Sequence, residues 1–317
     1  MQMHEIFYVI PLYGLTIKSS LGSGDKLDAE TFISNDLTCI NNELTAEWGE
    51  QFGRIDTSII SNCTAFVYGR SKLNHPDADY RGFLEERLHY IGQFLSTLWM
   101  VKDNAVNMGF GYLRARLDKL HRTYEGLQLS QIVTMADGCR PEECPTILDR
   151  DTLREARELF RRFTTNPKKG EDVKTRLHKS INPTRIQRAH YFLQASRSTS
   201  DVGIKIALYC TALEALFGTD KQELTHRLSE RVAVYAGGVD QRLGVYQDMK
   251  RAYNVRSGVL HGASIQKAYD GIKVEDISRR CDQLLRVCLI RSLNDDLFNK
   301  PNSEINKYFL ERIFLGG

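Results

Sequence analysis

The segment 206–217 constrains the fold of this chain more than any other, because Glu214 is the only formal charge among its twelve residues. A helix that is apolar nearly all round is buried in a folded protein. A carboxylate inside such a helix is costly unless it is paired, hydrogen-bonded or protonated. The sequence therefore predicts a buried helix in which Glu214 has a partner. That partner is either an ordinary core cation or a catalytic cation that Glu214 orients, with Arg256 the first candidate.

The 317 residues are enough for two domains. Apolar, β-branched and aromatic runs separated by glycines predict a small sheet in residues 1–70. Residues 79–102 carry apolar side chains at spacings of three and four, which predicts a helix that packs on this sheet. Two prolines and a glycine interrupt the pattern within residues 136–145, which we interpret as a linker. We therefore predict an N-terminal α+β domain over residues 1–140, which senses or binds an unknown ligand.

The remainder of the chain has helical periodicity almost throughout. We expect helices at about 151–163, 184–197, 202–217, 222–237, 241–261, 275–297 and 303–314. Consecutive helices with short connections are typical of a bundle. The predicted fold class is therefore α+β and mainly α-helical, with a C-terminal helical bundle over residues 150–317.

Targeting and cysteine patterns indicate a cytoplasmic protein. The first ten residues lack a basic region and a long apolar run, and no segment is apolar enough to span a membrane. The seven cysteines include no C-x-x-C pair. Cys139 and Cys144 resemble half of a zinc site that no second pair completes, so we expect no metal and no cofactor. Cys281 and Cys288 lie seven apart, which favours thiols packed in a helical core.

Common enzyme signatures are absent from the sequence. Gly22-Ser23-Gly24 lacks the third glycine of a dinucleotide site, and there is no phosphate-binding P-loop, H-E-x-x-H or G-x-S-x-G motif. Nucleotide hydrolases, zinc proteases and serine hydrolases therefore lose their usual support.

The segment 246–262 places an arginine on an apolar helical face. At about 100° per residue, that face carries Tyr246, Met249, Tyr253, Arg256 and Leu260. A guanidinium cannot lose its charge there, so it requires an anion, either a protein carboxylate or a phosphate.

His261 would lie about 140° round a continuous helix from Arg256. Two arrangements would bring the side chains to one target. The helix could bend or unwind at Gly258, or two chains could share the site across a two-fold axis.

Three motifs in order resemble one protein family. They are Ala-Leu-Glu-Ala-Leu-Phe at 212–217, then Glu223 with Leu-Ser-Glu-Arg-Val-Ala at 228–233, then Arg256-Ser-x-x-x-His261-Gly262. Together they resemble the Apea-like branch of the HEPN superfamily (higher eukaryotes and prokaryotes nucleotide-binding domains), over about residues 150–300.

The spacing of five residues from arginine to histidine is, on its own, weak support for this resemblance. Four of the eight histidines have an arginine five residues earlier: 70/75, 116/121, 185/190 and 256/261. Only the last pair follows the segment 212–217 and ends at a glycine, so the flanking motifs carry the assignment.

The resemblance implies a helical domain that usually forms a homodimer and often cleaves RNA without a metal. Neutral His261 would act as general acid and base, and Arg256 would stabilise the scissile phosphate. Ser257 stands where active members often have Asn, Asp or His, although its hydroxyl can still bind a phosphate oxygen. The resemblance further implies an endoribonuclease toxin or effector in antiphage defence, acting by abortive infection.

A basic region supplies an expected RNA contact. Residues 150–200 hold thirteen Lys or Arg and five Asp or Glu, so the local charge is 13 − 5 = +8. Arg154, Arg157 and Arg161 follow one helix edge and are candidates for an RNA track. The alternative is a solvated face on which these arginines pair with Glu155 and Glu158.

A non-catalytic function remains open at this stage. A HEPN module of this kind can instead bind RNA or a nucleotide, or mediate dimerisation or regulation.

Overall fold

The computed structural model describes residues 3–74, 79–104, 106–117, 123–133, 146–165, 183–219, 224–262 and 268–314. The protein is α+β and mainly helical, as the sequence predicts. It divides into two compact units: Met1–Met135 with Glu143–Lys174, and Ala136–Glu142 with Thr175–Gly317. Within the described residues, no helix combines the length and the apolar character that crossing a membrane requires.

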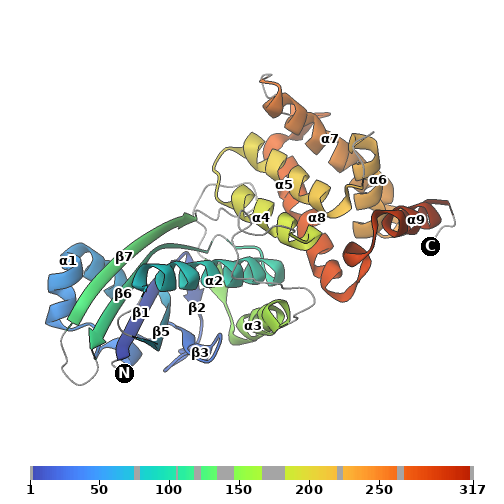
Figure 1. Ribbon diagram of the computed structural model, residues 1–317. Helices are drawn as coiled ribbons and strands as arrows, with labels where there is room; N and C mark the ends of the chain where they lie inside the picture. The colour runs from blue at the N-terminus through green and yellow to red at the C-terminus, as the bar shows by residue number, and fades with distance from the viewer. Residues whose placement is uncertain are drawn as a thin grey trace. The chain divides into compact units, whose positions relative to one another are not determined.

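The first unit contains an antiparallel sheet (Figure 1). Its order is β3 (Asp25–Lys26), β4 (Thr31–Ser34), β5 (Ala65–Asn74), β1 (Met3–Tyr13), β6 (Asn107–Leu117) and β7 (Thr123–Val133). A separate parallel pair joins β2 (Leu15–Ile17) to β8 (Thr146–Leu148). The sheet predicted in the first 70 residues is confirmed, while β6 and β7 were not predicted.

Each face of the sheet carries an apolar core. Strand β1 contributes to both, since it is apolar at odd and even positions alike. Even-numbered residues such as Ile6 and Tyr8 share a core with α2 (Tyr80–Val101), the helix predicted at 79–102. Odd-numbered residues such as Phe7 and Val9 share a second core with Trp48. Trp48 belongs to α1 (Ala46–Ser61), which follows the short 3₁₀ helix η1 (Leu37–Ile40).

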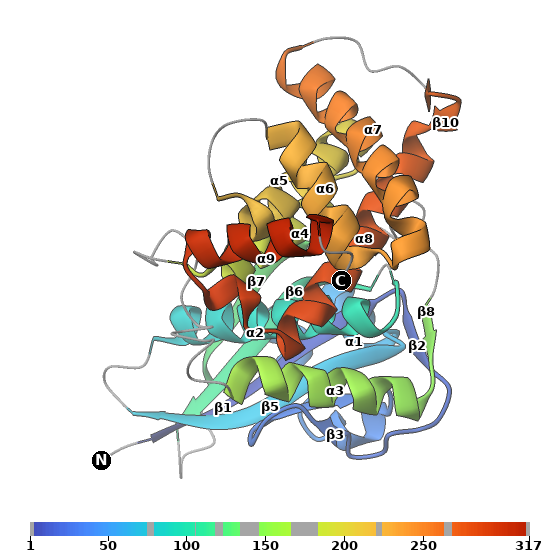
Figure 2. The same ribbon diagram turned by 90° about the vertical axis from the view of Figure 1, so that its right-hand side faces the viewer.

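Helix α3 (Arg150–Thr165) belongs to the first unit, which corrects the expected start of the helical domain at residue 150. Asp149 begins the helix by accepting a hydrogen bond from the Thr152 backbone N–H at 2.8 Å. The apolar stripe of α3 includes Leu153 and Phe160 and joins the core formed with α2 (Figure 2). Phe160 packs edge-on against Tyr90, with ring centroids 4.9 Å apart. An amphipathic pattern shows that a helix has a buried face, but not which unit buries it.

The second unit is helical. Its elements are α4 (Arg185–Arg197), α5 (Val202–Phe217), α6 (Leu224–Ala236), η3 (Val239–Gln241), α7 (Arg242–Leu260), β9 (Ala268–Tyr269), β10 (Ile272–Lys273), α8 (Val274–Asn294), η4 (Leu297–Asn299) and α9 (Asn302–Phe314). Helix α5 contacts α4, α6, α7 and α8, and most of its side chains are buried. The helices predicted in this part of the chain are confirmed to within a few residues, and so is the burial of α5.

A buried polar network links three helices of this unit. Asp282 on α8 lies 3.3 Å from the Arg197 guanidinium of α4, and these side chains are 1% and 0% exposed. The Tyr209 hydroxyl of α5 donates to the same carboxylate at 2.6 Å. Burial, and then the charge of Asp282, raise the pKa of Tyr209 well above its ordinary value. The Asp282 carboxylate therefore accepts hydrogen bonds from side chains of α4 and α5. These partners stabilise its negative charge in the core.

Asp282→Asn should lower the free energy of unfolding by about 3–5 kcal/mol, because it leaves the Arg197 charge buried without its counter-ion. Asp276→Asn is the matched control, since Asp276 is on the same helix with a side chain 50% exposed, and it should change stability by less than about 0.5 kcal/mol. Urea denaturation followed by circular dichroism measures both. Equal effects of the two variants would contradict a structural role for the network.

Candidate functional site

Arg256 and Glu214 form an ion pair between α7 and α5. The Arg256 Nη2 atom lies 3.1 Å from Glu214 Oε2, and the side chains are 19% and 18% exposed. The partner expected for Glu214 from the apolar character of its helix is therefore confirmed. Whether the pair serves catalysis remains a prediction.

Tyr253 completes the surroundings of this arginine. Its ring centroid lies 4.8 Å from the Arg256 guanidinium carbon, and its hydroxyl accepts from Nη1 at 3.1 Å. Burial, and then the charge of Glu214, raise the pKa of Tyr253 above its ordinary value. Sequence reasoning placed Tyr253 on the same stripe but gave it no role, although the spacing of three residues on a helix predicts such a contact.

The pair retains unused hydrogen-bonding capacity. Within the described part of the chain, Arg256 Nε and Glu214 Oε1 are buried and have no hydrogen-bond partner. Buried polar atoms are usually satisfied. Arg256 therefore has a buried donor without an acceptor, while Glu214 and Tyr253 hold the guanidinium in place.

His261 ends α7 and is exposed. Its backbone N–H donates to the Ser257 carbonyl at 3.0 Å, so the last turn remains intact. Gly262 follows with a positive φ of 68°, the left-handed conformation that terminates many helices at a glycine. The side chain of His261 therefore projects from the end of the helix.

Helix α7 runs through Gly258 without a break, which corrects the expectation that the helix could bend or unwind there. On an ideal helix Arg256 and the position of His261 are about 140° apart, so the two side chains leave α7 on different sides. Ser257 lies between them and is half-buried. Leu260 shares the face of Arg256 one turn on and is 60% exposed.

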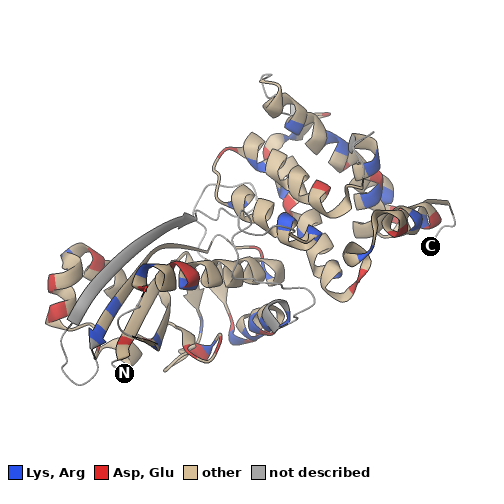
Figure 3. Cartoon of the chain, in the orientation of Figure 1, with Lys and Arg blue, Asp and Glu red and all other residues tan. Residues whose placement is uncertain are grey.

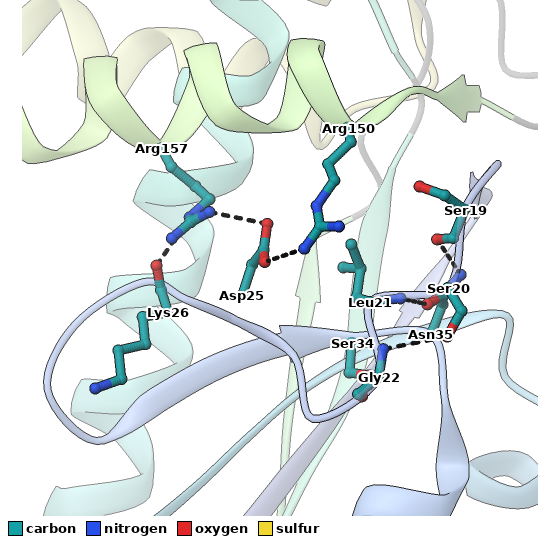
Figure 4. Close-up of polar contacts among 10 residues, drawn as sticks. All are labelled: Ser19, Ser20, Leu21, Gly22, Asp25, Lys26, Ser34, Asn35, Arg150 and Arg157. Carbon is teal, nitrogen blue, oxygen red and sulfur yellow. Dashed lines mark hydrogen bonds and ion pairs between the residues drawn. The ribbon is translucent and has the colours of Figure 1, made fainter.

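Arg157 is occupied within the first unit rather than free for RNA, which corrects its assignment to an RNA track (Figure 4). Its Nη1 atom lies 2.9 Å from Asp25 Oδ2, and its Nε donates to the Lys26 carbonyl at 2.8 Å. Arg150 also contacts Asp25, at 3.3 Å. Burial lowers the pKa of Arg157 from its ordinary value, while Asp25 opposes this. Arg157 therefore links α3 to β3 through an ion pair and a hydrogen bond.

The other two candidates of the track lie on the surface of α3, whose basic residues are all arginines (Figure 3). Arg154 and Arg161 are exposed. Arg154 lies 2.9 Å from Asp151, so its partner is not one of the glutamates considered from the sequence. The chain from 166 to 182, which holds much of the basic region, lies outside the described residues.

The cysteine and metal expectations have different outcomes. Cys281 and Cys288 are buried in α8, which confirms them as packed core thiols. Cys139 and Cys144 lie outside the described residues. Among the residues that the structure describes, no cluster of three His, Cys, Asp or Glu side chains could hold a metal ion.

Comparisons with known proteins give no independent assignment. The chain matches no family model, and neither curated proteins nor solved structures yield a match. The candidate site is therefore defined by the residues around Arg256 and His261 and their geometry.

Arg157→Gln should lower the free energy of unfolding by about 1–3 kcal/mol, because it leaves Asp25 and the Lys26 carbonyl without their charged donor. Arg154→Gln, on the exposed side of the same helix, should change it by less than about 0.5 kcal/mol. Thermal and urea denaturation of both variants measure the difference. If Arg157→Gln is neutral for stability while it weakens RNA binding, the structural role is wrong.

Proposed function

We propose that this protein is a metal-independent endoribonuclease of the HEPN type. The observation that carries the proposal is the position of the Arg256 guanidinium on α7. Glu214 of α5 and Tyr253 of α7 hold it, and an exposed His261 lies at the end of α7. The order of motifs that resembles the Apea-like branch supports the same activity.

The chemistry requires only the groups of these side chains. Neutral His261 takes the proton of a ribose 2′-hydroxyl, and the 2′-oxygen attacks the adjacent phosphorus. Arg256 stabilises the negative charge that develops on the phosphoryl oxygens. The bond from phosphorus to the 5′-oxygen breaks, a protonated histidine returns a proton to that oxygen, and the products are a 2′,3′-cyclic phosphate and a 5′-hydroxyl.

A shared site between two chains is the arrangement that suits the unbroken helix. Since Arg256 and His261 point to different sides of α7, a two-fold axis would place the arginine of one chain opposite the histidine of the other. The exposed Leu260 next to Arg256 adds apolar surface for such a contact. We therefore include a homodimer in the proposal.

The biological role follows from the resemblance. An effector of antiphage defence would damage host or phage RNA in the cytoplasm, and the first unit would sense or bind the trigger. Exposed Arg154 and Arg161 remain candidate RNA contacts, now without Arg157.

A non-catalytic module is the second candidate, and one observation favours it. Glu214 already neutralises Arg256 inside the chain, so the pair satisfies the needs of a core ion pair without a substrate. Ser257, in place of the usual Asn, Asp or His, is consistent with that alternative. Such a module would bind RNA or a nucleotide, or mediate dimerisation.

Purified protein should cleave total RNA in the presence of a chelator and leave 2′,3′-cyclic phosphate ends. We expect Arg256→Ala to lower the rate by about 10²–10³ and His261→Ala by about 10²–10⁴. Arg279→Ala and His226→Ala, which change partly exposed residues on α8 and α6, should leave it unchanged. Intact RNA with the wild type, or equal cleavage by all variants, would favour the non-catalytic module.

Mixed dimers test whether two chains share the site. Arg256→Ala and His261→Ala chains with different tags are co-expressed, and the mixed species is purified through both tags. If each site takes its arginine and its histidine from different chains, the mixed dimer has one complete site and recovers up to about half of the wild-type rate. Inactive mixed dimers, together with an active wild type, would place both groups of each site in one chain.

A further inference from the structure

A pocket of about 520 Å³ lies in the first unit, far in sequence from the residues assigned to RNA cleavage. Its lining includes Phe7, which also belongs to the apolar core that contains Trp48 of α1. Its lining residues come from three adjacent strands and two loops: Glu5, Ile6, Phe7, Glu30, Glu43, Arg70, Ser71, Lys72, Arg114 and Arg116.

Strand register brings the cations of this pocket together. Phe7 of β1 lies opposite Arg70 of β5 on one side and Arg114 of β6 on the other. Two residues earlier, Glu5 lies opposite Lys72 and Arg116 in the same way. Positions two apart in a strand share a face, and directly opposite side chains are neighbours. The sheet therefore presents two cross-strand rows with a cation at each end.

One carboxylate serves three guanidinium groups in the pocket. Glu43 lies 3.2 Å from Arg70 Nε and 3.9 Å from Arg116 Nη1, and it forms a close ion pair with Arg114. Glu47 lies 3.9 Å from Arg116 Nη2, so the three guanidinium groups and their two carboxylates have a formal charge of 3 − 2 = +1. Lys72 lies 3.5 Å from Glu5 and offsets it, and with Glu30 the pocket lining and Glu47 together sum to 4 − 4 = 0. The excess of positive charge is therefore confined to the three guanidinium groups.

Arg114 is held rigidly in the pocket wall. Its side chain is 0% exposed, its Nη1 donates to the Glu43 carbonyl at 2.9 Å, and its guanidinium lies over the Trp48 ring at 5.5 Å. Burial, and then the charge of Arg116, lower the pKa of Arg114 from its ordinary value. Among the described residues, the Nε atoms of Arg114 and Arg116 are buried without an acceptor. Crowded, incompletely satisfied guanidinium groups are unfavourable unless an anion joins them.

We propose that this pocket binds a phosphorylated small molecule of nucleotide size through its phosphate. A phosphate monoester carries a charge of about −1.5 to −2 near neutral pH, which offsets the local excess. One guanidinium can satisfy a planar carboxylate, whereas arginines from both sides of β1 suit the several oxygens of a phosphate. The volume lies within the range of about 300–1,000 Å³ that is usual for small-ligand sites.

The arginines have distinct roles in this arrangement. Arg114 keeps its ion pair with Glu43 and forms a rigid part of the pocket wall. Arg70 and Arg116 have side chains 52% and 27% exposed, so they can turn toward an incoming phosphate. The Arg70 guanidinium lies 5.5 Å from the Phe7 ring, so an apolar surface adjoins the phosphate position.

Calorimetric titration of the full chain with pyrophosphate, ADP and citrate at fixed ionic strength tests the site. We expect saturable binding of pyrophosphate and ADP, with citrate weaker. Arg116→Gln and Arg70→Gln should each weaken binding at least about tenfold. Arg81→Gln is the matched control, because Arg81 is 74% exposed on α2, across the sheet, and it should bind as the wild type does.

The outcomes separate the sources of the phosphate. Tighter binding of ADP than of pyrophosphate supports a nucleotide, and equal binding supports a phosphate site without nucleoside contacts. No saturation at millimolar concentrations, citrate binding as tightly as pyrophosphate, or unaffected Arg116→Gln and Arg70→Gln variants would overturn the proposal. So would a single-stranded RNA that displaces ADP from the arginine cluster at far lower concentration. Unchanged melting temperatures of the variants ensure that a loss of binding reflects the site.

Discussion

The packing of the second unit depends on burying α5 while its polar side chains keep hydrogen-bonding or charged partners. The helix supplies Glu214 to Arg256 of α7 at one position and Tyr209 to Asp282 of α8 at another, where Arg197 of α4 also binds. An unpaired charge in such surroundings is far less stable than a paired one. Partner choice therefore fixes how α4, α7 and α8 lie against α5, and the candidate site is one result of that requirement.

Helix positions in this protein followed from the spacing of apolar residues and, for α5, from a nearly continuous apolar segment. Which unit buries a given face depends on contacts distant in sequence. Phe160 of α3 packs on Tyr90 of α2, and Arg157 finds Asp25, more than 130 residues earlier. Neither partner is visible in the local pattern, so α3 was assigned to the wrong unit and Arg157 to the surface.

The two arginine sites differ in how far sequence could reveal them. Glu214 stood out because it interrupts an apolar helix, and that anomaly led directly to Arg256. The pocket cations gave a weaker signal: Arg114 and Arg116 alternate with buried residues on β6, as on an ordinary half-solvated strand. Only strand pairing places them across β1 from Arg70, and the loop residue Glu43 contacts all three. Such convergence depends on register, which one sequence does not specify.

The net charge at each of the two arginine sites determines how strongly that site attracts an added anion. At the pocket, three guanidinium groups contact two carboxylates, Glu43 and Glu47, so a phosphate meets one surplus positive charge within one chain. At Arg256, Glu214 supplies a matching charge, and a phosphate there must share the guanidinium with a carboxylate. A second copy of the chain would bring its own Glu214 together with its Arg256, so these residues of a second chain add no net charge. Within one chain, an added anion is therefore attracted more strongly by the three guanidinium groups of the pocket than by the Arg256–Glu214 pair.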